Sequence, residues 1–210
     1  MRSLTPRIVL ELLAHEGIVP EAYRDSQGIW TWSIGITNAS GHQVYPRYRD
    51  KPQTLDHCLG VFMWLLRERY LPAVLKTFGE HELAEHELGA ALSFHYNTGA
   101  IARAEWCRLY LRGDREGAAR AFLNWSRPPA IIPRRKRERD LFFDGTWSAD
   151  GSARLYSVSK PGYHPCRGRR VEIAEAVNRL FANDEPKSEE ICRPSVPEPR
   201  RANWFDWLFG

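Results

Sequence analysis

The sequence changes its periodicity twice, and these changes constrain the fold more than any other feature. Residues 5–16 begin with a Thr-Pro pair, which is typical of a helix start, and carry an apolar stripe at helical spacing. Residues 17–53 are broken by prolines and glycines and contain the β-branched, aromatic run "IWTWSIGIT", which favours short strands joined by turns. From residue 54 the helical spacing returns, and Pro72 is expected to kink the end of that helix.

The segments that follow the long helix are predominantly helical in pattern. Helices closed by Gly, Asn or a proline cluster are predicted at 82–97, 100–113, 114–125 and 134–145. This order predicts an α+β fold, with a small β-hairpin lobe at about 17–53 and a larger helical lobe at about 54–150 that includes the first helix. The long helix would join the two lobes, with a cleft between them.

The C-terminal part has weaker signals. We expect residues 1–150 to form the main domain and 151–182 to form an extension, with a candidate edge strand in "ARLYSVS" and an amphipathic helix in "GRRVEIAEAVNRLF". Residues 183–210 comprise a proline-rich, charged linker and the aromatic segment Ala202–Gly210. That segment either docks on the helical lobe, which we favour, or contacts a partner or membrane surface, or is a frayed end.

Composition excludes several classes of protein. Of the 210 residues, 43% are hydrophobic and 12% aromatic, too many for a disordered chain, and no run of about 18 apolar residues exists to span a membrane. The first residues lack the long apolar stretch of a signal peptide, so synthesis in a cytoplasm is expected. Four scattered cysteines without a C-x-x-C pair predict ordinary thiols, and a disulfide formed after export remains an alternative. We expect neither a metal nor an organic cofactor.

The basic charge balance allows several partners. A net charge of +4 and a pI near 9.0 suit nucleic acid, an anionic membrane, or an anionic polymer such as the bacterial cell wall. The densest basic run, "PRRKRERD" at 133–140, includes Glu138 and Asp140, so a solvated helix face is favoured over a nucleic-acid patch.

Three polar residues in "HEGIVPEAYRDSQGIWTWSIG" point to chemistry. Glu16 lies at a helix C-terminus, where the macrodipole raises the pKa of a carboxyl group and favours retention of its proton. A hairpin turn near Gln27 and Gly28 would bring Asp25 and Thr31 together, where their oxygens could hold one water. A proton-holding acid and a water-holding carboxylate are what inverting glycoside hydrolysis requires. The alternative for Glu16 is a solvated carboxylate at a helix end.

The same segment and two later ones resemble the phage-type lysozymes, glycoside hydrolase family 24. The family's Glu, Asp and Thr fall without a gap on Glu16, Asp25 and Thr31, within "EG", "AYRD", "GIWT" and "IGIT". Further along, "ALSFHYNTGA" resembles the family's buried-helix motif, and "PRRKRERDLFFDGTW" resembles its closing segment. The matches keep their order from about Leu10 to Trp147.

The resemblance implies a lysozyme-like fold and a muramidase activity. Such an enzyme hydrolyses the β-1,4 bond between N-acetylmuramic acid and N-acetylglucosamine of peptidoglycan, and serves as a phage or prophage endolysin. It would be a monomer that waits in the host cytoplasm until a holin opens the membrane, and then acts at the cell wall in the periplasm. The rival hypotheses are a catalytically weak wall-binding protein of the same fold, and a nucleic-acid-binding protein that uses residues 133–140.

Supporting residues follow from the same resemblance. Arg134 falls on the arginine that pairs with the catalytic glutamate in T-even members of the family, Arg135 competes for that role, and a surface position is the alternative for both. Trp30 and Trp32 are candidates either for stacking on sugars or for anchoring the sheet. His95 is favoured as a hydrogen-bonded interior histidine, with substrate contact as the alternative.

The chain also departs from the family pattern. Many members read T-x-G-x-G-H-T, whereas Thr31 is followed here by "WSIGIT", which places Ser33 at the first glycine and Ile36 at the histidine. The departure bears on the geometry and stability of the sheet and leaves the three proposed catalytic positions unchanged.

Overall fold

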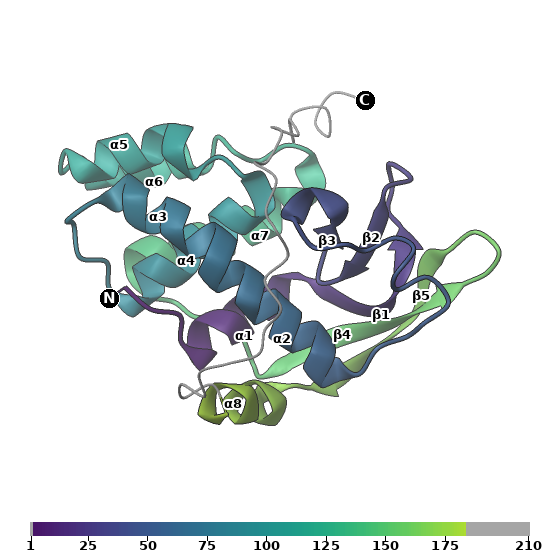
Figure 1. Cartoon of the computed structure of the whole chain (residues 1–210). Coiled ribbons are helices and arrows are strands. Elements are labelled where there is room, and N and C mark those ends of the chain that lie inside the picture. The colour runs from purple at the N-terminus through teal and green to yellow at the C-terminus, as the bar shows by residue number, and fades with distance from the viewer. Residues whose placement is uncertain (1, 184–210) are drawn as a thin grey trace. The chain divides into compact units, whose positions relative to one another are not determined.

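The computed structural model describes residues 2–183 and confirms the predicted α+β class. Two compact units are present (Figure 1). The helical unit comprises residues 2–15 and 64–150, and the sheet unit comprises residues 16–63 together with 151–183. The predicted linker from residue 184 and the aromatic segment at 202–210 lie outside the described residues.

The helical unit is built around a buried central helix. Its elements are α1 (Pro6–His15), η2 (Leu66–Tyr70), α3 (Leu71–Phe78), α4 (Glu85–Thr98), η3 (Ile101–Arg103), α5 (Glu105–Leu111), α6 (Arg115–Phe122), η4 (Pro129–Ile131) and α7 (Ile132–Asp144). Helix α4 buries most of its residues, and Phe94 on it meets Trp106 and Phe122 with ring centroids 5.3 Å apart in each pair. Phe142 packs on Trp106 at 4.9 Å, so one aromatic cluster joins α4, α5, α6 and α7.

Local signals set the ends of these helices. The Thr5 hydroxyl oxygen accepts the N–H of Ile8 at 3.2 Å and caps α1, while the Asp114 carboxylate accepts the N–H of Gly117 at 2.8 Å and caps α6. Helix α4 ends at Gly99, whose φ of 63° is the left-handed conformation that glycine adopts without strain. The Thr-Pro and helix-closing patterns of the sequence therefore act as expected.

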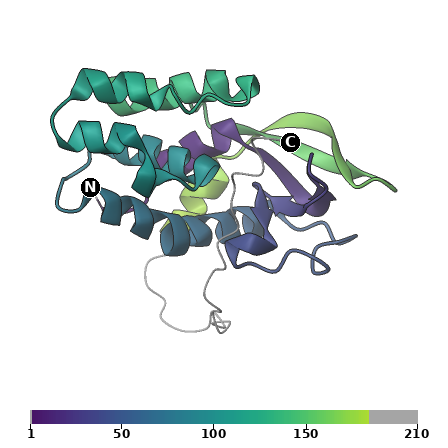
Figure 2. The same cartoon turned by 90° about the horizontal axis from the view of Figure 1, so that it is seen from above.

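The sheet unit contains one five-stranded sheet. Its elements are β1 (Gly17–Arg24), β2 (Trp30–Ser33), β3 (Ile36–Thr37), η1 (Asn38–Ser40), α2 (Leu55–Leu65, whose last two residues cluster with the helical unit), β4 (Ser152–Ser159), β5 (His164–Glu172) and α8 (Ala174–Ala182). The strand order is β3-β2-β1-β4-β5. Strand β1 runs antiparallel to β2 and pairs in parallel with β4 through Gly17 with Arg154 and Ile18 with Leu155. Strands β4 and β5 form a long, twisted hairpin, shown in green in Figure 2.

The C-terminal part differs from its prediction in two ways. The strand expected at an edge, β4, lies inside the sheet, and β5 takes the edge position. Residues 168–172, expected as the start of a helix, belong to β5, and α8 begins only at Ala174. The physical reason is that β5 is mostly exposed on both faces, so its sequence has no alternation of apolar and polar residues for a strand pattern to reveal.

The long helix expected from residue 54 is composite. Helix α2, the π-helical turn η2 and α3 follow one another without a gap from Leu55 to Phe78. Pro72 was expected to kink the end of this helix, but it occupies the first turn of α3, directly after the π-helical turn. A proline is tolerated at a helix start because the amide that it lacks would be unpaired there.

A histidine–tyrosine cluster of Trp32, His42, Tyr48 and His57 forms the polar core of the sheet unit. Trp32 is fully buried, stacks on Tyr48 with centroids 3.8 Å apart, and donates its Nε1–H to the Pro20 carbonyl at 2.8 Å. The Tyr48 hydroxyl is hydrogen-bonded to His42 Nε2 at 2.8 Å and to His57 Nε2 at 3.1 Å. The Tyr48 hydroxyl therefore provides a hydrogen-bond partner for one ring nitrogen of each histidine.

The predictions about cysteines and membrane-spanning segments can be compared with the structure only over residues 2–183. Cys58, Cys107 and Cys166 are free thiols, and Cys192 lies outside the described residues. None of the helices between residues 2 and 183 combines the length and apolar composition that a membrane crossing requires.

Candidate active site

The hairpin between β1 and β2 brings two of the predicted site residues together. Asp25 Oδ1 accepts the backbone N–H groups of Gln27 and Ile29, each at 2.9 Å, and Gly28 takes a φ of 74° to close the turn. Thr31 Oγ1 lies 3.4 Å from Asp25 Oδ2 and 3.1 Å from the Ile29 carbonyl oxygen. The turn therefore fixes one carboxylate oxygen and directs the other towards the threonine hydroxyl.

Glu16 stands at the other end of β1. It directly follows the last residue of α1, as the sequence predicts, and its side chain is half-buried. Both Glu16 and Asp25 act electrostatically on the Tyr23 phenol: burial first, then these two carboxylates, raise the pKa of Tyr23 above its usual range. The two carboxylates therefore share one phenol as a neighbour, and Tyr23 stays protonated beside them.

Sequence reasoning missed Tyr23, although a signal existed. Tyr23 belongs to the quoted "AYRD" segment and stands two residues before Asp25, and on the ladder it is paired with Thr31. Residues two apart on a strand point to the same face, so the β prediction for this segment already grouped Tyr23 with Asp25. A phenol at this place can donate a hydrogen bond to an anion or to a substrate oxygen.

The departure from the family pattern has a structural consequence at Ser33. Ser33 takes a φ of 55°, a left-handed conformation that glycine adopts freely and serine rarely does. Its buried hydroxyl donates to the Cys58 carbonyl at 3.2 Å, which ties β2 to α2 and compensates for the strain. Ile36, at the histidine position, is 1% exposed, so an apolar side chain is buried there.

The two tryptophan candidates differ in exposure. Trp32 has no exposed surface and belongs to the histidine–tyrosine cluster, so it anchors the sheet and is closed to a sugar. Trp30 is half-buried and packs against Tyr45 at 4.8 Å and Tyr163 at 5.1 Å, while the Arg24 guanidinium lies 4.6 Å from its ring centroid. Trp30 therefore connects β2 to the tip of the β4–β5 hairpin. Contact between Trp30 and a sugar stays a prediction.

The helical unit contains the predicted supporting arginine. Arg134 Nε donates to Glu138 at 2.9 Å, and its Nη2 lies 3.3 Å from both the carbonyl and the hydroxyl oxygen of Ser93. Ser93 Oγ donates to the same carboxylate at 2.5 Å. Arg134 is thus held in one rotamer by the buried Glu138, and its pairing with Glu16 stays a prediction.

Arg135 has a different role from the one considered for it. Its Nε donates to the Trp125 carbonyl at 3.0 Å, its Nη2 donates to Asn97 at 2.7 Å, and its Nη1 donates to Glu138. Arg135 is 1% exposed and Glu138 is fully buried, so the expectation of a solvated helix face is wrong for these residues. The charge pattern was misleading because a buried ion pair and an exposed one look the same in sequence.

His95 lies on α4 and is partly exposed. Tyr70 meets its ring edge-on at 5.5 Å, and its buried Nδ1 has no hydrogen-bond partner among the described residues. Burial lowers the pKa of His95 to about 4, so the ring is neutral near pH 7. His95 is therefore only partly buried and lacks the expected hydrogen bond at Nδ1, and substrate contact by it stays a prediction.

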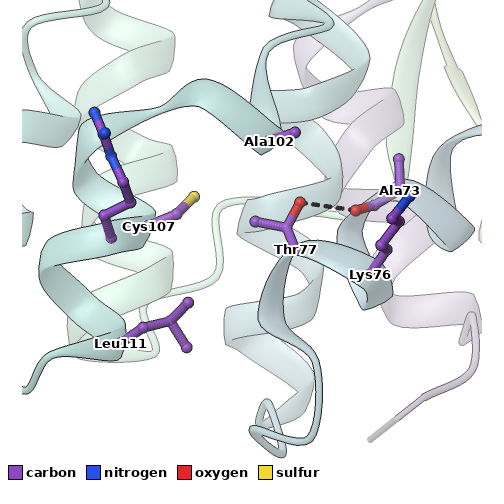
Figure 3. Close-up of a pocket in the computed structure, with 7 residues that line it drawn as sticks. Ala73, Lys76, Thr77, Ala102, Cys107 and Leu111 are labelled. Carbon is purple, nitrogen blue, oxygen red and sulfur yellow. Dashed lines mark hydrogen bonds between the residues drawn. The ribbon is translucent and has the colours of Figure 1, made fainter.

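A pocket of about 360 Å³ lies elsewhere in the helical unit (Figure 3). Cys107 and Leu111 on α5 form one wall, and Lys76 and Thr77 on α3 form the other. The Thr77 hydroxyl donates to the Ala73 carbonyl at 2.9 Å and is therefore occupied. Burial raises the pKa of the Cys107 thiol, which favours its protonated, unreactive form. Within residues 2–183 no group of three His, Cys, Asp or Glu side chains is arranged to hold a metal ion.

Comparison with known proteins assigns the family. The phage lysozyme family matches residues 13–138, which is more than half of the chain and includes Glu16, Asp25, Thr31 and Arg134. No curated protein sequence matches the chain significantly.

Solved structures of similar fold agree with the family match. A P22 lysozyme variant shares 26% identity, with a TM-score of 0.56 over 68% of this chain and 99% of its own. The endolysin from Escherichia coli O157:H7 phage FAHEc1 shares 20% identity, with a TM-score of 0.58 over 70% of this chain and 96% of its own. The muramidase domain of SpmX from Asticaccaulis excentricus shares 22% identity, with a TM-score of 0.53 over 68% and 98%. The chain belongs to the phage lysozyme family and is a glycoside hydrolase of the lysozyme type.

Proposed function

We propose that the chain is an inverting peptidoglycan muramidase that cleaves the β-1,4 bond between N-acetylmuramic acid and N-acetylglucosamine. The family match supports peptidoglycan as the substrate. Glu16 acts as the general acid that protonates the leaving oxygen, and Asp25 with Thr31 holds the attacking water. Arg134 fixes the orientation of Glu16.

The observation that carries this proposal is the geometry at Asp25. One oxygen of its carboxylate is held by two backbone amides, and the other faces the hydroxyl of Thr31 at 3.4 Å. A pair of oxygens held in this way presents one acceptor and one hydroxyl to a water, which orients the lone pair that attacks the sugar. A covalent mechanism would instead need the carboxylate free to approach the anomeric carbon.

The biological role follows from this chemistry as part of the proposal. The chain acts as a phage or prophage endolysin that reaches the periplasmic wall from the host cytoplasm after a holin opens the membrane, and it works as a monomer. Co-expression with and without a holin tests this role: lysis should need the holin, and lysis without it would contradict the proposed route.

The decisive experiment replaces the proposed acid. Glu16→Gln should fold and should lower the release of soluble muropeptides by at least about 10²-fold, the low end for loss of a general acid. Glu116→Gln, an exposed carboxylate in the helical unit, is the matched control and should keep wild-type activity. Normal turnover by Glu16→Gln would end the mechanism as proposed. Absence of muropeptide release by the wild-type protein would favour the rival hypothesis of a catalytically weak wall-binding protein.

Product analysis tests the bond and the stereochemistry. Mass spectrometry should find N-acetylmuramic acid at the new reducing end, and proton NMR of the first product should show the α-anomer, because inversion of a β-linkage requires it. A β-anomer would show that Asp25 and Thr31 do not act through a water. Asp25→Asn and Thr31→Ala should each slow turnover without unfolding the chain.

A further inference from the structure

The turn that joins β4 to β5 reaches the strands of the candidate site. This turn, residues 160–163, lies outside the segment that the phage lysozyme family matches, which ends at residue 138. The carbonyl oxygen of Tyr163 accepts the backbone N–H of Arg24 on β1 at 2.7 Å. The Tyr163 ring meets Trp30 on β2 edge-on, with ring centroids 5.1 Å apart. One residue of the turn therefore contacts both strands of the hairpin that holds Asp25 and Thr31.

The two residues that Tyr163 contacts are the immediate neighbours of the proposed water-holding residues. Arg24 directly precedes Asp25, and Trp30 directly precedes Thr31. Arg24 and Trp30 are also paired in register across β1 and β2. Because a peptide unit is planar and nearly rigid, a shift of Arg24 or Trp30 moves the residue that follows it. Contacts at Tyr163 therefore bear on the backbone positions of both Asp25 and Thr31.

Arg24 also ties the turn of the β1–β2 hairpin to this contact. Its guanidinium lies 4.6 Å from the centroid of the Trp30 ring, and its Nη1 donates to the Gly28 carbonyl at 2.8 Å. Gly28 belongs to the turn whose backbone amides hold Asp25. The Arg24 side chain therefore connects the ring that Tyr163 touches with the turn that orients the carboxylate.

The two oxygens proposed to hold the water need support from outside the pair. Thr31 Oγ1 and Asp25 Oδ2 are 3.4 Å apart, which is longer than the roughly 2.5–3.0 Å usual for a hydrogen bond between two oxygens. The Thr31 hydroxyl is closer to the Ile29 carbonyl oxygen, at 3.1 Å. The mutual orientation of the pair therefore depends on the backbone of the hairpin, which the Tyr163 contacts restrain.

Tyr163 is itself held by several contacts. Its hydroxyl oxygen lies 3.0 Å from both carboxylate oxygens of Asp50 and accepts the Nε–H of Arg49 at 3.0 Å. Lys160, at the start of the same turn, contacts the Asp50 carboxylate and lies 2.7 Å from Glu21 on β1. These contacts fasten the turn between β4 and β5 to β1 and to residues 49 and 50.

The backbone of Tyr163 argues against an ordinary turn residue. Its φ of 58° is the left-handed conformation, which costs free energy for a side chain larger than that of glycine. Glycine or asparagine would form this turn with less strain. Such strain is retained where surrounding contacts hold the residue in place, and it gathers at functional sites. The contacts of the ring and hydroxyl therefore account for the tyrosine better than the turn does.

We propose that Tyr163 is a positioning residue for the hydrolytic reaction. It restrains the backbone before Asp25 and Thr31, and thereby keeps these two residues at the separation that the attacking water requires. This inference rests on the proposed function, because it takes Asp25 and Thr31 to hold that water. Tyr163 acts through these residues and does not contact the substrate itself. Its removal should slow the chemical step and leave substrate binding unchanged.

Steady-state kinetics on soluble peptidoglycan fragments test the proposal. Tyr163→Gly removes the ring and the hydroxyl at a φ that glycine adopts freely, so the chain should fold. Its kcat should fall roughly tenfold while KM stays unchanged, because a small misplacement of reacting groups slows the chemical step without removing a substrate contact. Tyr163→Asn tolerates the same φ and should show the same change. Tyr163→Phe keeps the ring and should retain most of kcat.

Arg167→Gly is the matched control. Arg167 lies on β5 of the same hairpin, has a φ of 51° and has an exposed side chain, so glycine makes the same backbone change there. This variant should keep the wild-type kcat. Thermal denaturation followed by circular dichroism checks that each variant is folded at the assay temperature. Equal losses of kcat in Arg167→Gly and Tyr163→Gly would overturn the proposal, because any loosening of the hairpin would then suffice.

A double-mutant cycle separates positioning from a merely structural role. If Tyr163 acts through the water-holding pair, Tyr163→Gly should lower kcat little further in a Thr31→Ala background. A role in stability alone would give additive losses. Additive losses, or a wild-type kcat in Tyr163→Gly, would refute this inference and leave the proposed function standing. Wild-type turnover by Thr31→Ala alone would instead refute the proposed role of Thr31, and this inference with it.

Discussion

The helical unit and the sheet unit bury polar groups in opposite ways. The helical unit encloses charges: Glu138 is fully buried between Arg134 and Arg135, which are 8% and 1% exposed. The sheet unit encloses neutral groups, the two histidines that share the Tyr48 hydroxyl, and keeps Arg154 and Arg170 of its hairpin exposed. The comparison shows that an arginine of this chain has a structural role where it is buried around a carboxylate.

The physical difference lies in how each cluster responds to loss of one member. A buried charge that loses its partner retains its full desolvation cost, whereas a neutral hydrogen bond that is lost costs much less. The stability contributed by Glu138 and its two arginines is therefore expected to be sensitive to substitution. The stability contributed by the histidine–tyrosine cluster is expected to be sensitive to pH.

The largest expected effect tests the buried charges. Glu138→Gln removes the buried carboxylate that Arg134 and Arg135 share and should lower the free energy of unfolding by roughly 3–5 kcal/mol. Urea denaturation followed by tryptophan fluorescence measures it. Glu116→Gln removes an exposed partner of Arg120, 3.7 Å away, and should leave stability nearly unchanged. Equal stability of the two variants would show that burial does not distinguish these pairs.

An intermediate effect is expected where the two strands of the β4–β5 hairpin pack on each other. Gly168→Ala places a Cβ atom 2.5 Å from the Tyr156 ring and should cost about 1–3 kcal/mol of stability, the range for overpacking. Adding Tyr156→Ala removes the ring and should recover part of that loss, which a double-mutant cycle measures. Gly60→Ala in α2 meets no atom within 4 Å and is the control, with unchanged or improved stability. Additive losses in the cycle would refute the contact.

The smallest effect concerns the neutral cluster. Burial first, then Arg47 and His57, lower the pKa of His42 to about 4, below its unfolded value of 6.5. The unfolded chain then takes up the proton first, so His42 contributes to stability fully above pH 6.5 and this contribution is lost as the pH falls towards 4. His42→Gln should therefore lose less stability than the wild type between about pH 7 and about pH 5.

The measurement for His42 is urea denaturation at the two pH values. His164→Gln, an exposed histidine on β5, is the control and should lose stability on acidification as the wild type does. His95, with a pKa also near 4, adds a loss of the same sign in all variants. An identical pH dependence in His42→Gln and the wild type would mean that the histidine–tyrosine cluster does not titrate as inferred.

Much of the fold was predictable because its signals are local. The Thr-Pro pair at the start of α1, the turn formers around Gly28 and the left-handed Gly145 that closes α7 each act within a few residues, and the structure bears them out. The proximity of Asp25 and Thr31 was predictable for the same reason, since a short hairpin holds both. Strand β5 and the interior position of β4 were not predictable, because pairing of β4 with β1 joins residues far apart in the chain.

The sequence by itself determined the α+β class, the order of the helices, the family and the three proposed catalytic positions, because these depend on motifs and spacings that are read along the chain. Only the tertiary structure decided that Arg135 and Glu138 are buried, that Trp32 is closed to substrate, and that Tyr23 adjoins both carboxylates. It also decided that Tyr163 contacts Arg24 and Trp30. The physical reason is that burial and the pairing of distant strands are properties of the assembled chain, and the same arginine costs or contributes free energy according to what surrounds it.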